Sequence, residues 1–216
     1  MVLKRFQFSL FQILVHLASL TPLAVAIFDF LTDPSFSGNV QRLEFRTGRL
    51  AIIWLILSLV GSPLYWLTGY YEFFKARKPL GRYAFLYAFL HFLAFLTLDY
   101  AWDLRLIWLS LGGTLYLLVG VIAFIILLLM AITSNPQSQA FLKRNWDRLH
   151  RFVYLAAALS VLHYFLIEKS DIRWPLIASA ILGLLLLVRL PPIRERITLH
   201  KPVKKVTIST RTRKAS

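Results

Sequence analysis

Long stretches without a charged side chain constrain the fold of this sequence more than any other feature. They cover residues 6–28, 50–71, 83–98, 106–142, 152–167 and 174–188. A membrane-spanning helix needs about 17 to 25 largely apolar residues. The third, fifth and sixth stretches fall slightly short of this length, but Arg and Lys at their ends can extend to the membrane surface. The pattern therefore predicts an all-α integral membrane bundle of six transmembrane helices.

The fourth stretch, residues 106–142, is too long for one span. Gly112 and Gly113 precede its most apolar part, and the segment Thr133-Ser134-Asn135-Pro136 follows it. Glycine pairs and Asn-Pro dipeptides mark helix ends. We expect one helix over residues 113–133, with loops on both sides.

The composition agrees with a membrane location. Hydrophobic residues make up 58% of the 216 residues and charged residues only 16%, whereas a soluble domain carries about 25% charged residues. The chain has no cysteine, which excludes disulfides, thiolate zinc sites, iron–sulfur clusters and covalent haem attachment. Any metal site must therefore use histidine or carboxylate ligands.

The distribution of positive charge predicts the orientation. A net charge of +15 would suggest nucleic acid binding in a soluble protein, but here the charges alternate between connections. Of the 25 Lys and Arg residues, 19 fall on one side of the predicted bundle. The six on the other side are Arg42, Arg46, Arg49, Arg105, Lys169 and Arg173. By the positive-inside rule we predict that both termini are cytoplasmic and that the basic loops contact anionic lipid rather than nucleic acid.

We predict one compact bundle over residues 1–192, followed by a basic cytoplasmic tail over residues 193–216. Pro191 and Pro192 should end the last span, and the tail lacks apolar periodicity, which is typical of a mobile extension. No internal repeat is apparent. Lys4 and Arg5 before an apolar run could instead belong to a signal peptide, but the charge count favours a retained first helix.

Standard catalytic motifs are missing from the sequence: it has no H-E-x-x-H, G-x-S-x-G, Walker A or G-x-G-x-x-G pattern. Hydrolase and nucleotide-motor functions therefore lose support. The ionisable residues at membrane depth are the histidines His16, His91, His150 and His163. Such groups are functional candidates, although each could also be a hydrogen-bonded core histidine, and His150 could be a solvated residue at a helix end.

His91 and His163 are the preferred pair of metal ligands. His91 lies midway between Arg82 and Asp99 in an aromatic-rich segment that would suit a flat apolar cofactor. The third and fifth spans run in the same direction, so the two histidines can reach a similar depth. Neutral imidazoles can ligate iron axially.

His150 is predicted to serve a separate, inner site. It precedes His163 by 13 residues, which corresponds to about 20 Å along a helix and a rotation that leaves the two rings about 140° apart. The third span offers no obvious partner, because Lys78 and Arg77 occupy the matching positions before His91.

Several short motifs together resemble the ferric-reductase-like transmembrane family, and within it the haem-binding membrane subunits of bacterial methionine sulfoxide reductase systems. The motifs are Thr47-Gly48-Arg49, Ser62-Pro63, Arg77-Lys78-Pro79-Leu80-Gly81, Tyr87-Ala88-Phe89-Leu90-His91, Thr133-Ser134, and Trp146-Asp147-Arg148-Leu149-His150-Arg151-Phe152-Val153-Tyr154-Leu155 through His163-Tyr164.

The resemblance implies an inner-membrane electron conduit with one or two b-type haems, ligated by His91, His150 and His163. It implies that electrons come from a cytoplasmic flavin reductase or from quinol. They would pass to a periplasmic molybdopterin enzyme that repairs oxidised methionine. FMN is also implied, with Arg77, Lys78 and Arg82 as candidate contacts, although no phosphate-binding motif locates it. His16 could supply a missing ligand.

Two functions of other classes remain open on the sequence. One is a small transporter or ion carrier whose buried histidines relay protons. The other is a structural or assembly factor in which the histidines only pack. The absence of acidic residues from the predicted span cores favours the electron conduit.

Overall fold

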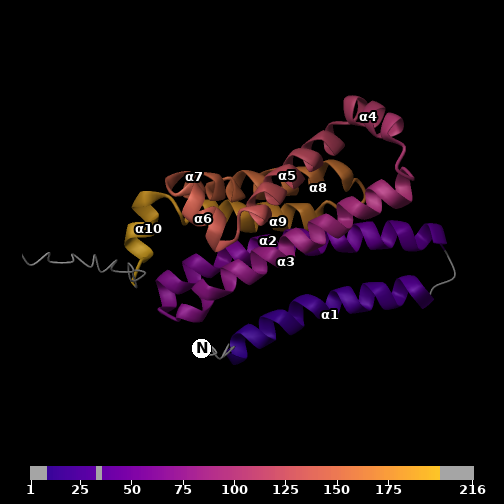
Figure 1. The fold of residues 1–216 in the computed structure, drawn as a ribbon. Helices are drawn as coiled ribbons and strands as arrows, with labels where there is room; N and C mark the ends of the chain where they lie inside the picture. The colour runs from indigo at the N-terminus through magenta and orange to yellow at the C-terminus, as the bar shows by residue number, and fades with distance from the viewer. Residues whose placement is uncertain (1–8, 33–35, 200–216) are drawn as a thin grey trace, which may run out of the picture.

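The structure, a computed structural model, describes residues 9–32 and 36–199 as ten α-helices and one π-helical turn (Figure 1). Lys4, Arg5 and tail residues 200–216, which the sequence predicts to be on the cytoplasmic side, lie outside the described residues. The long helices are α1 (Leu10–Thr32), α2 (Phe36–Thr68), α3 (Tyr71–Ala94), α5 (Leu115–Ile132), α8 (Val153–Ile167) and α9 (Arg173–Leu187). The π-helical turn η1 (Phe95–Asp99) extends α3.

Successive long helices run in opposite directions, so the bundle has two distinct ends (Figure 1). One end, which we name the α4 end, carries the short helix α4 (Leu104–Gly113). The other, the α10 end, carries α6 (Pro136–Leu142), α7 (Arg144–Arg151) and α10 (Pro191–Ile197). The six basic residues of the predicted outer side lie toward the α4 end, as the alternation requires. Which end faces the cytoplasm stays a prediction.

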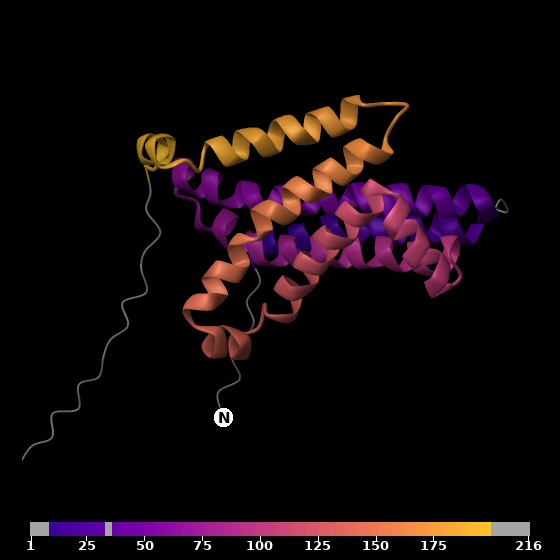
Figure 2. The ribbon, with the colours of Figure 1, turned by 90° about the horizontal axis from the view of Figure 1, so that it is seen from above.

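Five to six helices are long and apolar enough to cross a membrane, which confirms the predicted all-α multi-pass architecture. Five candidate spans cover Leu10–Thr32, Val40–Thr68, Tyr71–Asp99, Leu115–Ile132 and Arg144–Ile167. The sixth combines α9 with α10, which bends away from it by 82° (Figure 2). Pro191 begins α10, because proline fits the first turn of a helix.

One expectation about the connections was wrong. The fourth span is α5, close to the predicted 113–133, but its flanks are the helices α4 and α6 rather than loops. Their N-caps explain this: Asp103 accepts hydrogen bonds from the backbone N–H of Arg105 and Leu106, and Asn135 accepts one from Ser138. Side-chain caps of this kind start helices. Residues 193–197, at the start of the predicted tail, lie within α10, and the division of the chain at residue 192 stays a prediction.

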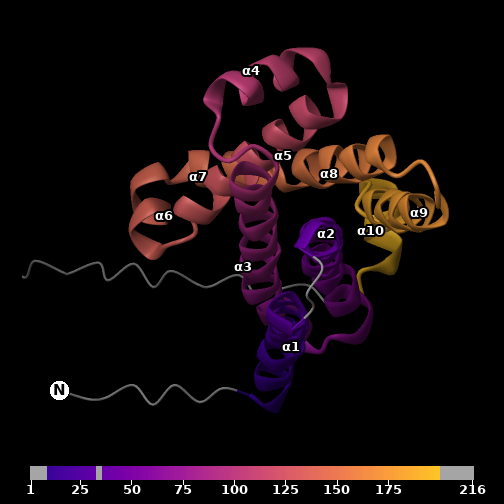
Figure 3. The same ribbon diagram turned by 90° about the vertical axis from the view of Figure 1, so that its right-hand side faces the viewer.

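Two antiparallel helix pairs build the centre of the bundle. Helix α2 packs along α3, and α5 packs along α8, while α1 covers α2 and α3, and α9 covers α2 and α8 (Figure 3). Fully buried Ala84, Ala156 and Ala157 lie in the shared core. Small residues of this kind let membrane helices approach closely.

The two helix pairs are related by a constant shift in sequence. Adding 72 to Gly48, Ala84 and His91 gives Gly120, Ala156 and His163. The α2–α3 pair and the α5–α8 pair also run in the same directions, as in parallel repeats related by an axis along the membrane normal. Because only a few positions match at this shift, the relationship was not apparent as a repeat in the sequence.

Candidate functional site

A cavity of about 560 Å³ lies between α2, α3, α5 and α8. Its size falls within the range of small-molecule and cofactor sites, about 300 to 1,000 Å³. Most of its lining is apolar, including Phe45, Phe92 and Phe124, and the rings of Phe92 and Phe124 stack with centroids 4.2 Å apart. His91 and His163 line it from opposite helix pairs. The cavity can therefore hold a flat apolar group within reach of two imidazoles.

His91 and His163 lie at the same depth, as predicted. Their ring centroids are 6.2 Å apart and their planes meet at 76°. A metal–imidazole bond of about 2 Å, added to a ring radius of about 1.1 Å on each side, places two axial rings about 6 Å apart. The observed separation therefore fits two imidazoles that ligate one ion from opposite sides.

Backbone carbonyls fix the tautomer of both rings. His91 Nδ1 lies 3.0 Å from the carbonyl oxygen of Glu44, and His163 Nδ1 lies 2.7 Å from that of Tyr116. Because a carbonyl oxygen only accepts hydrogen bonds, each Nδ1 carries the proton and each Nε2 keeps its lone pair. Metal-ligating histidines characteristically donate their second N–H in this way.

Glycines make room for both histidine rings. Gly48 and Gly120 each lie four residues after the carbonyl that accepts the imidazole hydrogen bond. A Cβ on Gly48 would be 3.3 Å from His91 Nδ1, and a Cβ on Gly120 would be 2.7 Å from His163 Nδ1. Without a side chain at these positions, each imidazole can reach a carbonyl on the neighbouring helix.

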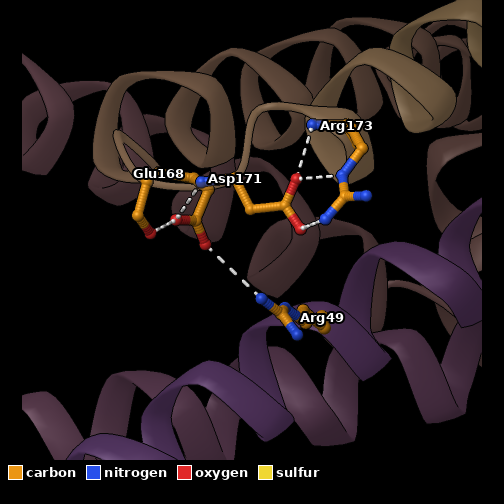
Figure 4. Close-up of polar contacts among 5 residues, drawn as sticks. Arg49, Glu168, Asp171 and Arg173 are labelled. Carbon is orange, nitrogen blue, oxygen red and sulfur yellow. Dashed lines mark hydrogen bonds and ion pairs between the residues drawn. The ribbon is translucent and has the colours of Figure 1, made fainter.

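Polar side chains gather at the α4 end of the cavity. Arg49 enters its lining from α2, and its guanidinium lies 3.4 Å from the carboxylate of Glu168, just beyond α8 (Figure 4). Glu168 is buried and accepts hydrogen bonds from the hydroxyl of Ser170 and the N–H of Asp171. These hydrogen bonds, with the charge of Arg49, hold the pKa of Glu168 below its ordinary value. The arginine is thus held at the polar mouth of a cavity whose middle is mostly apolar.

His150 lies apart from the pair, near the α10 end. Its ring stacks on Trp146 with centroids 3.9 Å apart, and its Nε2 lies 3.3 Å from the hydroxyl of Thr133. The 72-residue shift relates it to Lys78. Among the described residues, no second histidine faces His150, so its predicted role as an inner ligand stays a prediction.

His16 does not join the His91–His163 pair. Its Nδ1 lies 2.8 Å from the hydroxyl of Tyr83, and the two rings meet edge to face. Tyr83 lies two helical turns before His91 on α3, and His16 is absent from the cavity lining. The contact with Tyr83 accounts for a histidine in α1 without a metal.

Arg77 and Arg82, the predicted flavin contacts, lie toward the α10 end and outside the cavity lining. Arg77 packs its guanidinium 5.0 Å from the centre of the Phe74 ring, and its side chain lies against Gly61. Arg82 is exposed. Nothing in their described surroundings supports a flavin site, so FMN stays a prediction.

The fold and the site define a multi-pass helical membrane protein with a partly buried histidine pair that lines a cavity. A family model described as "Ferric reductase like transmembrane component" matches residues 47–161, which include His91 and His150. The chain belongs to this family.

Within it the chain is a homologue of proteins named "Protein-methionine-sulfoxide reductase heme-binding subunit MsrQ". One, from Xanthomonas euvesicatoria pv. vesicatoria, is 39% identical over 183 residues, which covers 80% of this chain and 82% of the relative. Another, from Rhodospirillum rubrum, is 36% identical over 187 residues, which covers 86% of this chain and 90% of the relative.

Sequence reasoning missed the site residues that are not ionisable. Gly48 was noticed only as part of a motif, and Gly120, Tyr116 and the carbonyl of Glu44 were not considered. The sequence spacing could have indicated the two glycines, because Gly48 and Gly120 precede His91 and His163 by the same number of residues. Arg49 entered the sequence analysis through the charge count and the Thr47-Gly48-Arg49 motif, neither of which predicts its place in the cavity lining.

Proposed function

We propose that this chain is a membrane electron-transfer subunit that holds a b-type haem between His91 and His163. The carrying observation is the pair of imidazoles 6.2 Å apart, each with Nδ1 bonded to a backbone carbonyl, at one cavity. The family membership and the haem-binding relatives support the same assignment. A bound haem supplies one-electron redox chemistry.

The residues of the chain would hold, orient and shield this group. His91 and His163 present Nε2 lone pairs from opposite helix pairs, and the carbonyls of Glu44 and Tyr116 fix their rotation. Such outer contacts raise ligand basicity. The phenylalanine lining excludes water, so the surroundings of the site favour electron transfer over reaction with solvent.

In the wider system, we propose that electrons enter from a cytoplasmic flavin reductase or quinol. They would leave to a periplasmic molybdopterin subunit that reduces methionine sulfoxide. The names of the relatives support a subunit of a methionine sulfoxide reductase system. The basic α10 end would then face the cytoplasm and the α4 end the periplasm. His150, near the α10 end, is our candidate ligand for a second haem.

The test is an absorption spectrum of the purified full-length protein with quantified haem per chain. We expect a Soret band that is strongly diminished in His91→Ala and in His163→Ala. His16→Ala is the matched control, because His16 lies in a membrane helix but outside the cavity, and it should keep the band. Protein that stays colourless when haem is supplied would refute the proposal, and pH-driven solute flux in such protein would favour a transporter.

A further inference from the structure

The cavity is chemically asymmetric along the bundle axis. Its middle is lined by aromatic and aliphatic side chains, whereas Gln41, Arg49, Asp99 and Lys169 line it toward the α4 end. A haem has the same asymmetry, since one edge of its apolar ring carries two propionate carboxylates. Polar residues at the α4 end of the cavity could therefore receive those carboxylates.

We propose that Arg49, together with the hydroxyl of Tyr164, binds a haem propionate and fixes the rotational position of the ring. This inference rests on the proposed function. It assigns a binding role to two residues that the histidine geometry does not involve. Arg49 and Tyr164 act on the acid groups of the ligand and leave ligation of the iron to the histidines.

Arg49 is placed to receive a carboxylate at the cavity mouth. Its guanidinium carbon lies 5.9 Å from the ring centres of both Phe45 and Tyr164, so aromatic side chains orient it. Arginine presents several N–H donors in a planar fork that matches a carboxylate. The contact with Glu168 is long, 3.4 Å, and involves only Nη2. Glu168 can therefore hold the arginine in place while other donors bind a ligand.

Tyr164 supplies the second, independent observation. Its side chain is buried, with 8% of its surface exposed, and it lines the cavity. Among the described residues its hydroxyl makes no well-formed hydrogen bond, and the polar group that it interacts with is the Arg49 guanidinium. An unsatisfied buried hydroxyl is costly, and a ligand carboxylate in the cavity would satisfy it.

Charge directs the propionate toward Arg49 rather than toward the acidic residues of the lining. The lining also contains the carboxyl groups of Glu44 and Asp99, which lie close together and offer a propionate no positive charge. Lys169, next to Glu168 in the sequence, adds a second positive charge to the lining. Arg49 and Lys169 are therefore the cations that the described cavity lining offers to an acid.

The test compares haem with its dimethyl ester, in which both propionates are capped. Detergent-purified full-length apoprotein is titrated with each compound, and binding is followed by the Soret band. The wild type should prefer haem by about tenfold or more, because a hydrogen bond to a charged group contributes about that much. Arg49→Gln should lose most of this preference while binding the ester as the wild type does.

Three further variants keep the test decisive. Arg46→Gln, on the same helix but paired with Asp29 outside the cavity, should retain the preference. Arg49→Lys should keep part of it through charge alone. Glu168→Gln should lose only part of the preference, because Glu168 positions the arginine but does not bind the ligand. A loss as large as in Arg49→Gln would assign the effect to the ion pair and overturn the proposal.

The outcomes separate this inference from the proposed function. In Arg49→Gln, an unchanged ratio of haem affinity to ester affinity, whether or not both affinities fall, would overturn propionate binding. It would leave the proposed haem site intact. A wild type that binds neither compound would refute the haem site itself.

Discussion

Gly120 lies directly against the ring of His163: a Cβ at Gly120 would be only 2.6 Å from Cε1 of the imidazole. The related glycine, Gly48, leaves more room, since its Cβ would be 3.3 Å from Cε1 of His91. The two equivalent positions therefore tolerate a methyl group to different degrees, although the chemistry of the two histidines is the same.

This difference predicts unequal effects of two matched substitutions. Gly120→Ala should displace the His163 ring from the carbonyl of Tyr116 and abolish most haem binding, because so short a contact cannot be kept. Gly48→Ala requires a shift of only a few tenths of an ångström, so it should retain haem with weaker affinity. Haem-to-chain ratios of the purified variants measure both, and equal losses in the two would contradict the assignment.

The angle between the histidine rings predicts the electronic spectrum of the oxidised protein. The two imidazole planes meet at 76°, which is close to perpendicular. If both rings ligated one haem iron at this angle, the two iron d-orbitals that interact with them would have similar energies. We expect a strongly anisotropic low-spin ferric signal in electron paramagnetic resonance. A rhombic signal typical of parallel rings would show that the rings rotate when iron binds.

Much of this arrangement was predictable from the sequence because it depends on hydrophobicity and charge. The spans, the pairing of His91 with His163 and the separate place of His150 follow from apolar length and position along each helix. The carbonyl acceptors and Gly120 do not, because they depend on how two helices are rotated against each other. Helices α4 and α6 were missed because a membrane-length argument overlooked the capping residues Asp103 and Asn135.

The role of Arg49 was hidden for a related reason. In the sequence it is one of six basic residues on one side, and its spacing does not distinguish it from Arg46. Only the fold turns Arg49 toward the cavity and Glu168, whereas Arg46 pairs with Asp29. Charge counting therefore predicted the side of the membrane but not the function of the individual residue.

The 72-residue shift predicts a gain of function at the α10 end. Lys78 takes the position related to His150, so Lys78→His should place a second imidazole opposite His150, as His91 is opposite His163. We expect the amount of low-spin haem per chain to rise. The rise should vanish in the double variant Lys78→His/His150→Ala, and Lys78→Gln serves as the control for loss of charge. An unchanged spectrum in Lys78→His would show that the repeat does not extend to this end.

The loop after α8 should make an acid-sensitive contribution to stability. Hydrogen bonds from the Ser170 hydroxyl and the Asp171 N–H, and the charge of Arg49, lower the pKa of Glu168 below its ordinary value of 4.5. As the pH falls, the unfolded chain binds this proton before the folded chain does. The stabilisation is therefore complete above about pH 5 and is lost as the pH falls through the lowered pKa.

Glu168→Gln tests this dependence. Gln keeps the size of the side chain but loses its charge, so the variant should unfold at a lower temperature than the wild type at pH 7. The difference in unfolding temperature should narrow as the pH falls below the ordinary value of 4.5 and through the lowered pKa of the folded wild type. Thermal unfolding of both proteins in the same detergent, followed by circular dichroism, measures the gap. Asp171→Asn should behave similarly, because its carboxylate accepts two hydrogen bonds from the Arg173 side chain, at 2.8 and 3.0 Å, which lower its pKa. A gap that stays constant from pH 7 to pH 3 would mean that the ionised form of Glu168 contributes nothing to the fold.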